Sequence, residues 1–175
     1  MAKITRVCLI GPESTGKTRL AERLAQHFVG TWLPEHAREY AEERENQLSY
    51  DDVEAIARGQ IQIADRGSQI AGLVIHDTDL ISTVVYARHY YGRVPEWIVE
   101  EATKRRADLY LLLDTDVPWI ADSARDTGGE SREDLFDAFR AALDEFEANW
   151  TMISGSWQER LDRASAAISA LRSAI

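Results

Sequence analysis

The chain has 175 residues, a formal net charge of −10 at pH 7 and one cysteine. This length fits one domain with a buried core, and no apolar run approaches the ~20 residues of a membrane-spanning helix. The acidic balance argues against a surface that binds DNA or RNA, and one cysteine excludes an intramolecular disulfide framework. The first predicted strand begins too early for a secretory signal to precede it, so we expect a cytoplasmic protein without nucleic-acid or membrane partners.

Short apolar runs alternate with stretches of helical periodicity along the chain. This alternation is typical of an α/β fold in which a parallel sheet carries helices on both faces. We predict five strands, at residues 6–10, 31–33, 73–76, 109–113 and 151–153. We predict seven helices, at residues 17–28, 37–45, 50–70, 80–91, 96–105, 131–149 and 158–173. Because such sheets bind ligands beyond the carboxyl ends of their strands, the residues that follow each strand form the candidate site.

The segment after the first strand carries the strongest motif. Residues 11–18 read GPESTGKT and match G-x-x-x-x-G-K-[ST], the phosphate-binding P-loop, between an apolar strand and an amphipathic helix. Glycines let the backbone wrap closely around a di- or triphosphate, and successive N–H groups point partial positive charge at its oxygens. Lys17 is expected to reach the β- and γ-phosphates, and Thr18 to bind Mg²⁺. We therefore predict a P-loop nucleoside triphosphatase (NTPase) fold whose nucleotide contacts include Gly11, Glu13, Ser14, Thr15, Gly16, Lys17 and Thr18.

Charged side chains follow the second strand in the segment PEHAREY, residues 34–40. Glu35 suits the group that orients an acceptor hydroxyl in line with the γ-phosphate, and His36 is an alternative base. Arg38 suits a contact to a hydroxyl, carboxylate or phosphate of the acceptor. The same residues also fit a helix N-terminus that is stabilised by acidic side chains in its first turn.

The third strand is followed by the sequence DTD, residues 77–79. An apolar strand that ends in aspartate is the Walker-B pattern, so we predict that Asp77 binds Mg²⁺ with Thr18. Asp77 is also a second candidate, beside Glu35, for the base. Asp79 either contacts the substrate or caps the next helix. His76 is expected to point away from Asp77 and to be a core histidine with satisfied hydrogen bonds.

The loops after the fourth and fifth strands complete the candidate site. Glycines bracketed by arginines predict a lid over the triphosphate at about residues 117–132, with an ordinary exposed loop as the alternative. From this lid, Arg125 and Arg132 would donate hydrogen bonds to the transferring phosphoryl group. Trp119 would stack on a ring or pack under the lid. The Ser-Gly-Ser turn at 154–156 either contacts the nucleotide base or is a plain turn.

Taken together, these motifs resemble those of the ribosylnicotinamide kinase domains of bacterial NadR proteins and related stand-alone P-loop ATPases. The resemblance runs in order from about residue 5 to the end, and rests on GPESTGKT, PEHAREY, Gly59 with Gln60, DTD at 77–79 and DVPW at 116–119. It implies transfer of the ATP γ-phosphate to the 5′-hydroxyl of nicotinamide riboside, giving nicotinamide mononucleotide. The chain departs from the family pattern at Pro34, where an aromatic residue is common, and at His36, where tyrosine is usual. It also departs at residues 122–125, where DSAR replaces D-G-x-R.

Other functions use similar residues. A nucleotide-dependent ATPase or switch would act on a protein partner without a small acceptor. A kinase of another nucleoside or nucleotide would use Arg38 and Arg125 to bind an acceptor that already carries phosphate. GTP is an alternative to ATP, although no N-K-x-D guanine motif is present. We predict a small-molecule kinase with the catalytic residues Lys17, Glu35, Asp77 and Arg125, and with the substrate-binding residues Glu35, Arg38, Asp77, Asp79 and Trp119.

Overall fold

The computed structural model describes residues 4–70, 72–118 and 128–174, without the side chains of residues 128–131. Its centre is a five-stranded sheet in the order β2-β3-β1-β4-β5, in which each strand runs parallel to its neighbours. This confirms the predicted parallel sheet. The strands are β1 (Ile4–Ile10), β2 (Thr31–Leu33), β3 (Gly72–Asp77), β4 (Leu109–Leu113) and β5 (Trp150–Ile153).

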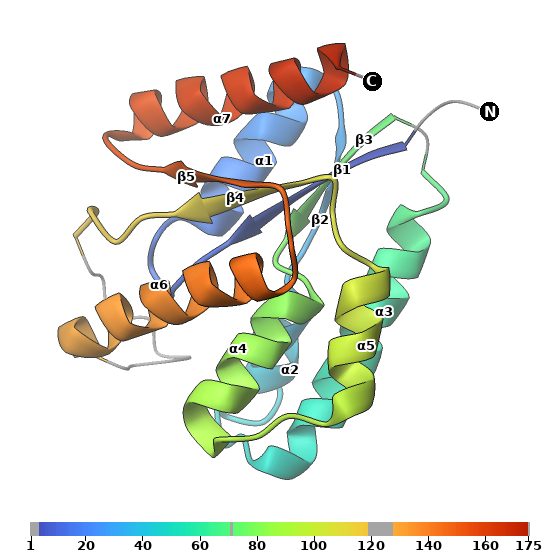
Figure 1. The fold of residues 1–175 in the computed structure, drawn as a ribbon, viewed down its shortest axis with the longest axis vertical. Coiled ribbons are helices and arrows are strands. Elements are labelled where there is room, and N and C mark those ends of the chain that lie inside the picture. The colour runs from blue at the N-terminus through green and yellow to red at the C-terminus, as the bar shows by residue number, and fades with distance from the viewer. Residues whose placement is uncertain (1–3, 71, 119–127, 175) are drawn as a thin grey trace.

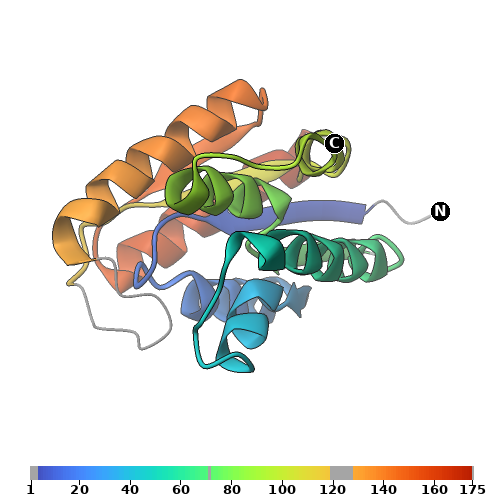
Figure 2. The same ribbon diagram turned by 90° about the horizontal axis from the view of Figure 1, so that it is seen from below.

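Helices cover both faces of the sheet, as predicted (Figures 1 and 2). One face carries α1 (Lys17–Phe28) and α7 (Trp157–Ser173). The other face carries α3 (Val53–Gly67), α4 (Leu80–Tyr91), α5 (Glu96–Lys104) and α6 (Gly128–Glu145). The short helix α2 (His36–Glu42) follows β2, and the 3₁₀ turn η1 (Tyr50–Asp52) precedes α3. No helix in the described ranges is both long and apolar enough to cross a membrane.

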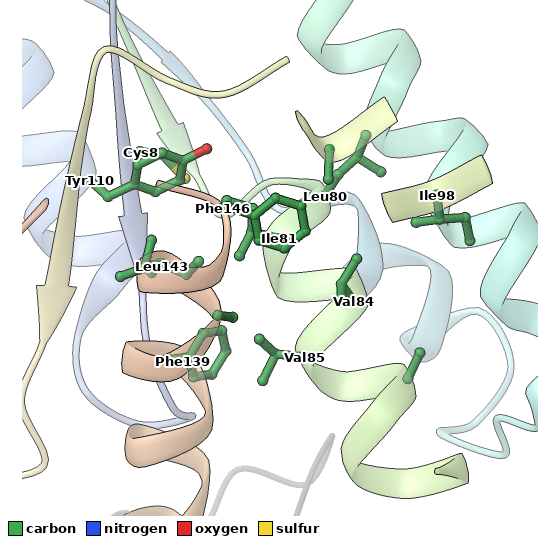
Figure 3. Close-up of a cluster of buried hydrophobic side chains, with 14 of the residues drawn as sticks. Cys8, Leu80, Ile81, Val84, Val85, Ile98, Tyr110, Phe139, Leu143 and Phe146 are labelled. Atoms are coloured by element: carbon green, nitrogen blue, oxygen red, sulfur yellow. The ribbon is translucent and has the colours of Figure 1, made fainter. Parts of the chain in front are cut away.

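Two hydrophobic clusters hold these layers together, and the alternation along β1 divides its side chains between them. Val7 and Leu9 pack with α1 and α7, whereas Cys8 and Ile10 pack with α4 and α6. Figure 3 shows the second cluster, in which Phe139 of α6 lies between the sheet and α4. Cys8 is buried in this cluster, where it packs as a small apolar residue, and burial raises the pKa of its thiol.

Helix ends account for most differences from the predicted elements. The predicted helix at 37–45 ends at Glu42, because Glu45 and Asn46 take positive φ angles of 52° and 61°. The predicted helix at 50–70 divides into η1 and α3, and a capping box between Ser49 and Asp52 starts η1. Helix α6 begins at residue 128 instead of 131, so the last five residues of the predicted lid form its first turn.

Candidate functional site

The P-loop joins the central strand β1 to α1 at the carboxyl edge of the sheet. Gly11 has a φ of 140°, and a Cβ atom there would lie 2.9 Å from the carbonyl oxygen of Leu113. Gly16 has a φ of 86° and is the N-cap of α1. The Thr15 hydroxyl donates to the Pro12 carbonyl at 2.9 Å, which closes the loop on itself. Both motif glycines therefore stand where another residue would be strained.

Lys17, at the start of α1, folds back over this loop. Its ammonium group donates to the carbonyl oxygens of Gly11 at 2.9 Å and Pro12 at 2.7 Å. Ser14 has a φ of 55°, a left-handed conformation that occurs in anion-binding turns of the backbone. Cationic and N–H donors are thus gathered around the space that the loop encloses.

Thr18 and Asp77 join the P-loop to the neighbouring strand. Asp77 ends β3, pairs in register with Leu9, and is 1% exposed. The Thr18 hydroxyl donates to Asp77 Oδ2 at 2.5 Å, whereas the buried Oδ1 has no hydrogen-bond partner in the part of the chain that the structure describes. Burial raises the pKa of Asp77, and so does the charge of Glu35; Lys17 and Thr18 oppose the shift.

An unpartnered carboxylate oxygen beside a threonine hydroxyl fits Mg²⁺, which prefers oxygen ligands. Among the residues that the structure describes, no group of three or more His, Cys, Asp or Glu side chains is placed to hold a metal ion. Mg²⁺ at this place would therefore rest on Thr18 and Asp77, together with water and phosphate oxygens, as is usual for this ion.

The charged segment after β2 lies close to Asp77. Glu35 is buried, and its charge acts on Asp77. Arg38 Nε lies 3.9 Å from Glu35 Oε2, and the arginine side chain is 47% exposed. The predicted acceptor residues are thus brought together beside the P-loop.

Gln60 of α3 links the residues that follow β2 to the residues that follow β3. This residue is buried; its amide nitrogen donates to the Thr78 carbonyl at 3.2 Å, and its amide oxygen accepts from the His36 N–H at 3.4 Å. The His36 ring packs so closely on Gly59 that a Cβ atom there would lie 1.9 Å from His36 Nε2. This packing favours Glu35 over His36 as the proton acceptor. Sequence reasoning noted Gly59 and Gln60 only through the resemblance.

Asp79 caps α4, which was one of its two predicted roles. Its Oδ1 accepts from the Ile81 N–H at 2.9 Å, and its Oδ2 accepts from the Tyr110 hydroxyl at 2.5 Å. Burial raises the pKa of Asp79 to about 6. His76 is buried, as expected, and burial lowers its pKa to about 4. The expectation that its hydrogen bonds are satisfied is wrong, because Nδ1 has no partner among the residues that the structure describes.

Arg132 of α6 lies at the phosphate end of the site. Its side chain is buried, and Nε and Nη2 have no hydrogen-bond partner among the described residues. Burial lowers the pKa of Arg132, and the charge of Glu13 in the P-loop opposes the shift. Two buried donors without partners are costly unless a ligand accepts from them. The other predicted lid residues, Arg125 and Trp119, lie outside the described residues.

A largely apolar pocket adjoins the residues that follow β2 and β3. It has about 570 Å³ of unfilled space, counted out to its open mouth, and Glu35, Thr78 and Asp79 line it together with residues of α3 and α4. Tyr86 and Tyr90 of α4 contribute rings that lie 8° from parallel with centroids 6.0 Å apart. A mainly apolar lining with a few polar groups is typical of a small-molecule site. The two tyrosines, one helical turn apart, were missed by the sequence reasoning.

A P-loop, a carboxylate beside its threonine and an adjoining small-molecule pocket define a nucleotide-binding protein of the P-loop class. The family model described as "AAA domain" matches residues 6–160 of the chain. The chain therefore belongs to this AAA domain family.

Curated relatives are similar over part of their length. The trifunctional NAD biosynthesis/regulator protein NadR of Salmonella typhimurium strain LT2 is 33% identical over 130 residues, which are 71% of this chain and 32% of that protein. The protein of the same description from Escherichia coli strain K12 gives the same values. The chain thus spans about a third of the length of these relatives.

Solved structures extend the similarity to 95% of the chain. A NadR protein in complex with NR has a TM-score of 0.73 and 28% identity, over 95% of this chain and 51% of that one. A NadR protein in complex with NAD and AMP-PNP has a TM-score of 0.76 and 28% identity, over 95% of this chain and 49% of that one. A deoxyadenosine kinase from M. mycoides, at 9% identity, has a TM-score of 0.69 over 95% of this chain and 100% of that one, and shares the fold.

The raised pKa of Asp79 makes stability depend on pH. The folded state binds this proton more tightly than the unfolded state, where the pKa is 3.8, so the stability from Asp79 is fully present below that value and is lost as pH rises through about 6. Asp79→Asn keeps a capping oxygen but does not titrate. The free energy of unfolding of the wild type, relative to that of D79N, should fall by about 2–3 kcal/mol between pH 4 and pH 7.

Urea denaturation of both proteins across this pH range measures the difference. The titration of His76 is common to the two proteins, so its contribution cancels. A difference that stays constant with pH would show that Asp79 has an ordinary pKa in the folded state.

Proposed function

We propose that the protein is a kinase that transfers the γ-phosphoryl group of ATP to the 5′-hydroxyl of nicotinamide riboside, giving nicotinamide mononucleotide. The observation that carries the proposal is the pair of carboxylates Asp77, which contacts Thr18 after the P-loop, and Glu35, which acts on Asp77 and lines the apolar pocket. The similarity to NadR proteins, one solved with NR and one with NAD and AMP-PNP, supports this substrate and this donor. The cytoplasmic location stays a prediction.

The phosphate end of the site supplies positive charge. Lys17 and the N–H groups of the P-loop would bind the β- and γ-phosphates, and the buried Arg132 would use its two unpartnered donors on the phosphoryl group in transfer. Thr18 and Asp77 would hold Mg²⁺, which neutralises charge on the phosphate oxygens when it is bound. The other lid arginine, Arg125, keeps its predicted role as a further donor to that group.

Residues at the acceptor end of the site would orient the 5′-hydroxyl and take up its proton. The 5′-oxygen attacks the γ-phosphorus, the bond from that phosphorus to the bridging oxygen of ADP breaks, and the hydroxyl proton passes to Glu35. Asp77 is the less suitable base, since Thr18 already donates to one of its oxygens. Arg38 would hold Glu35 in place and reach a ribose hydroxyl. Asp79 lines the pocket and is proposed as a further acceptor contact.

The pyridine ring would pack on aromatic side chains. Tyr86 and Tyr90 line the pocket on α4, and they provide the aromatic surface that the family pattern places before Glu35, where this chain has Pro34. Trp119 keeps its predicted role as a substrate contact. A switch that acts on a protein needs no such pocket beside its γ-phosphate, so the pocket favours the kinase over the switch.

Release of ADP from magnesium-ATP, with and without nicotinamide riboside, tests the proposal. We expect the nucleoside to raise the rate by at least about tenfold, with nicotinamide mononucleotide seen by mass spectrometry, because the reaction needs a bound acceptor. Lys17→Ala should abolish this activity. Stimulation by another nucleoside alone would contradict the proposed substrate, and no stimulation by any nucleoside would contradict the kinase.

Glu35→Gln should lower kcat by about 10²–10⁴-fold, because the acceptor hydroxyl loses its proton acceptor. The dissociation constant for magnesium-ATP should stay within about twofold, since the side chain lies on the acceptor side of Asp77. Glu39→Gln, one helical turn along α2 and exposed, is the matched control. Equal losses in kcat and in ATP binding would remove Glu35 from the proposed role.

Tyr90→Ala should raise the KM for nicotinamide riboside by about tenfold, the effect of losing one stacked ring, and leave the KM for ATP nearly unchanged. Tyr90→Phe keeps the ring and removes the hydroxyl, which contacts Glu13 at 3.5 Å, so its KM for nicotinamide riboside should stay close to the wild-type value. Steady-state kinetics with each substrate varied in turn measures both values. An unchanged KM for nicotinamide riboside in the alanine variant would show that the pyridine ring does not pack on Tyr90.

A further inference from the structure

Arg160 of α7 joins three loops at the carboxyl edge of the sheet. Its side chain is 0% exposed. Its Nε donates to the Gly155 carbonyl at 2.9 Å, Nη1 donates to the Thr15 carbonyl at 3.1 Å, and Nη2 donates to the Asp114 carbonyl at 3.0 Å. The P-loop and the loops that follow β4 and β5 therefore share one guanidinium group.

Asp116 balances the charge of this group. One carboxylate oxygen pairs with Arg160 Nη2, and the other accepts from the Gly155 N–H at 2.5 Å. A buried guanidinium is tolerated when it is paired and hydrogen-bonded in this way. Only arginine offers planar donors in several directions at once, and lysine cannot reproduce the arrangement.

The bond to Thr15 has a direct consequence for the P-loop. In a trans peptide, the carbonyl of one residue and the N–H of the next point in opposite directions. Arg160 draws the Thr15 carbonyl out of the loop, so the Gly16 N–H of the same peptide points into the loop, where the phosphates are expected. Because Gly16 has a φ of 86° and no side chain, little else in its own backbone resists rotation of this peptide.

Trp157 supports the same peptide from the start of α7. A Cβ atom on Gly16 would lie 2.1 Å from Cη2 of the Trp157 ring, so the ring rests directly on the glycine. A capping box between Ser156 and Glu159 begins α7 and fixes the turn that carries both Trp157 and Arg160. In Figure 1, α7 lies beside α1, which continues from the P-loop.

We infer that Arg160 is a positioning residue for nucleotide binding: it locks the Thr15–Gly16 peptide with its N–H toward the phosphates. The inference rests on the proposed function only in assuming that the P-loop binds the phosphates of ATP. Arg160 touches no substrate, since it is enclosed by the three loops that it joins. Its loss leaves the glycine peptide free to turn a carbonyl oxygen toward the phosphates.

Arg160→Met tests the inference, and Arg163→Met is the matched control. Arg163 lies one turn further along α7 and donates to the Ser154 hydroxyl at 2.7 Å in the same exit loop. By calorimetry on protein whose fold is checked by circular dichroism, R160M should raise the Kd for magnesium-ADP by at least about tenfold, the effect of one lost charge-assisted hydrogen bond. The Kd of R163M for magnesium-ADP should stay within about twofold of the wild-type value. The KM of R160M for the nucleoside acceptor should also stay within about twofold of the wild-type value.

Magnesium pyrophosphate, which lacks base and ribose, is the second probe. R160M should weaken its binding by about the same factor as that of ADP, because the effect acts on phosphate. A Kd for ADP within about twofold of wild type, or a loss seen with ADP and not with pyrophosphate, would overturn the inference. If R160M does not fold, R160K takes its place under the same criteria, since lysine keeps the charge and loses the fork.

Different results would contradict the proposed function and the proposed role of Arg160. A wild-type protein that binds magnesium-ADP but phosphorylates no nucleoside would contradict the proposed function, and the comparison with R160M would still stand. A kinase whose R160M variant binds ADP normally would contradict the role of Arg160 alone.

Discussion

The hydrogen bond between Thr18 and Asp77 joins the two halves of the site. Thr18 opens α1 directly after the P-loop, and Asp77 closes β3, the strand that pairs with β1 in register from Ile4 to Leu9. A shift of one residue in this register would move the carboxylate to the other face of the sheet. The phosphate loop, Glu35 after the neighbouring strand β2 and the pocket that Glu35 lines are all arranged around this contact.

The charges around the proposed phosphate site differ in sign from the net charge of the chain. The chain carries a net charge of −10, yet the place proposed for the triphosphate is surrounded by Lys17, Arg132 and backbone N–H groups. Burial and the charge of Glu35 raise the pKa of Asp77, so a divalent cation at its free oxygen would relieve the repulsion between the two carboxylates. Such a site would favour the magnesium complex of a nucleotide over the bare anion.

Sequence reasoning predicted the features that depend on neighbouring residues. The P-loop, the five strands and the acidic residues at the strand ends follow from short motifs and apolar runs. In the structure, the P-loop and these acidic residues lie together at one edge of the sheet. Sequence reasoning missed features that depend on contacts across the fold. Arg160 reaches Thr15 across 145 residues, and nothing in the periodicity of α7 distinguishes it from a surface arginine. Tyr86 and Tyr90 became recognisable only when α4 was seen to line the apolar pocket, and the contacts of Gln60 with Thr78 and His36 only when α3 was placed beside them.

A crystal structure with magnesium AMP-PNP and nicotinamide riboside bound together tests the central claim most directly. The account predicts the phosphates in the P-loop, the nucleoside in the pocket lined by Tyr86 and Tyr90, and its 5′-hydroxyl within hydrogen-bond distance of Glu35 and in line with the γ-phosphorus. A nucleoside bound elsewhere, or a 5′-hydroxyl directed away from the γ-phosphate in a closed complex, would contradict it.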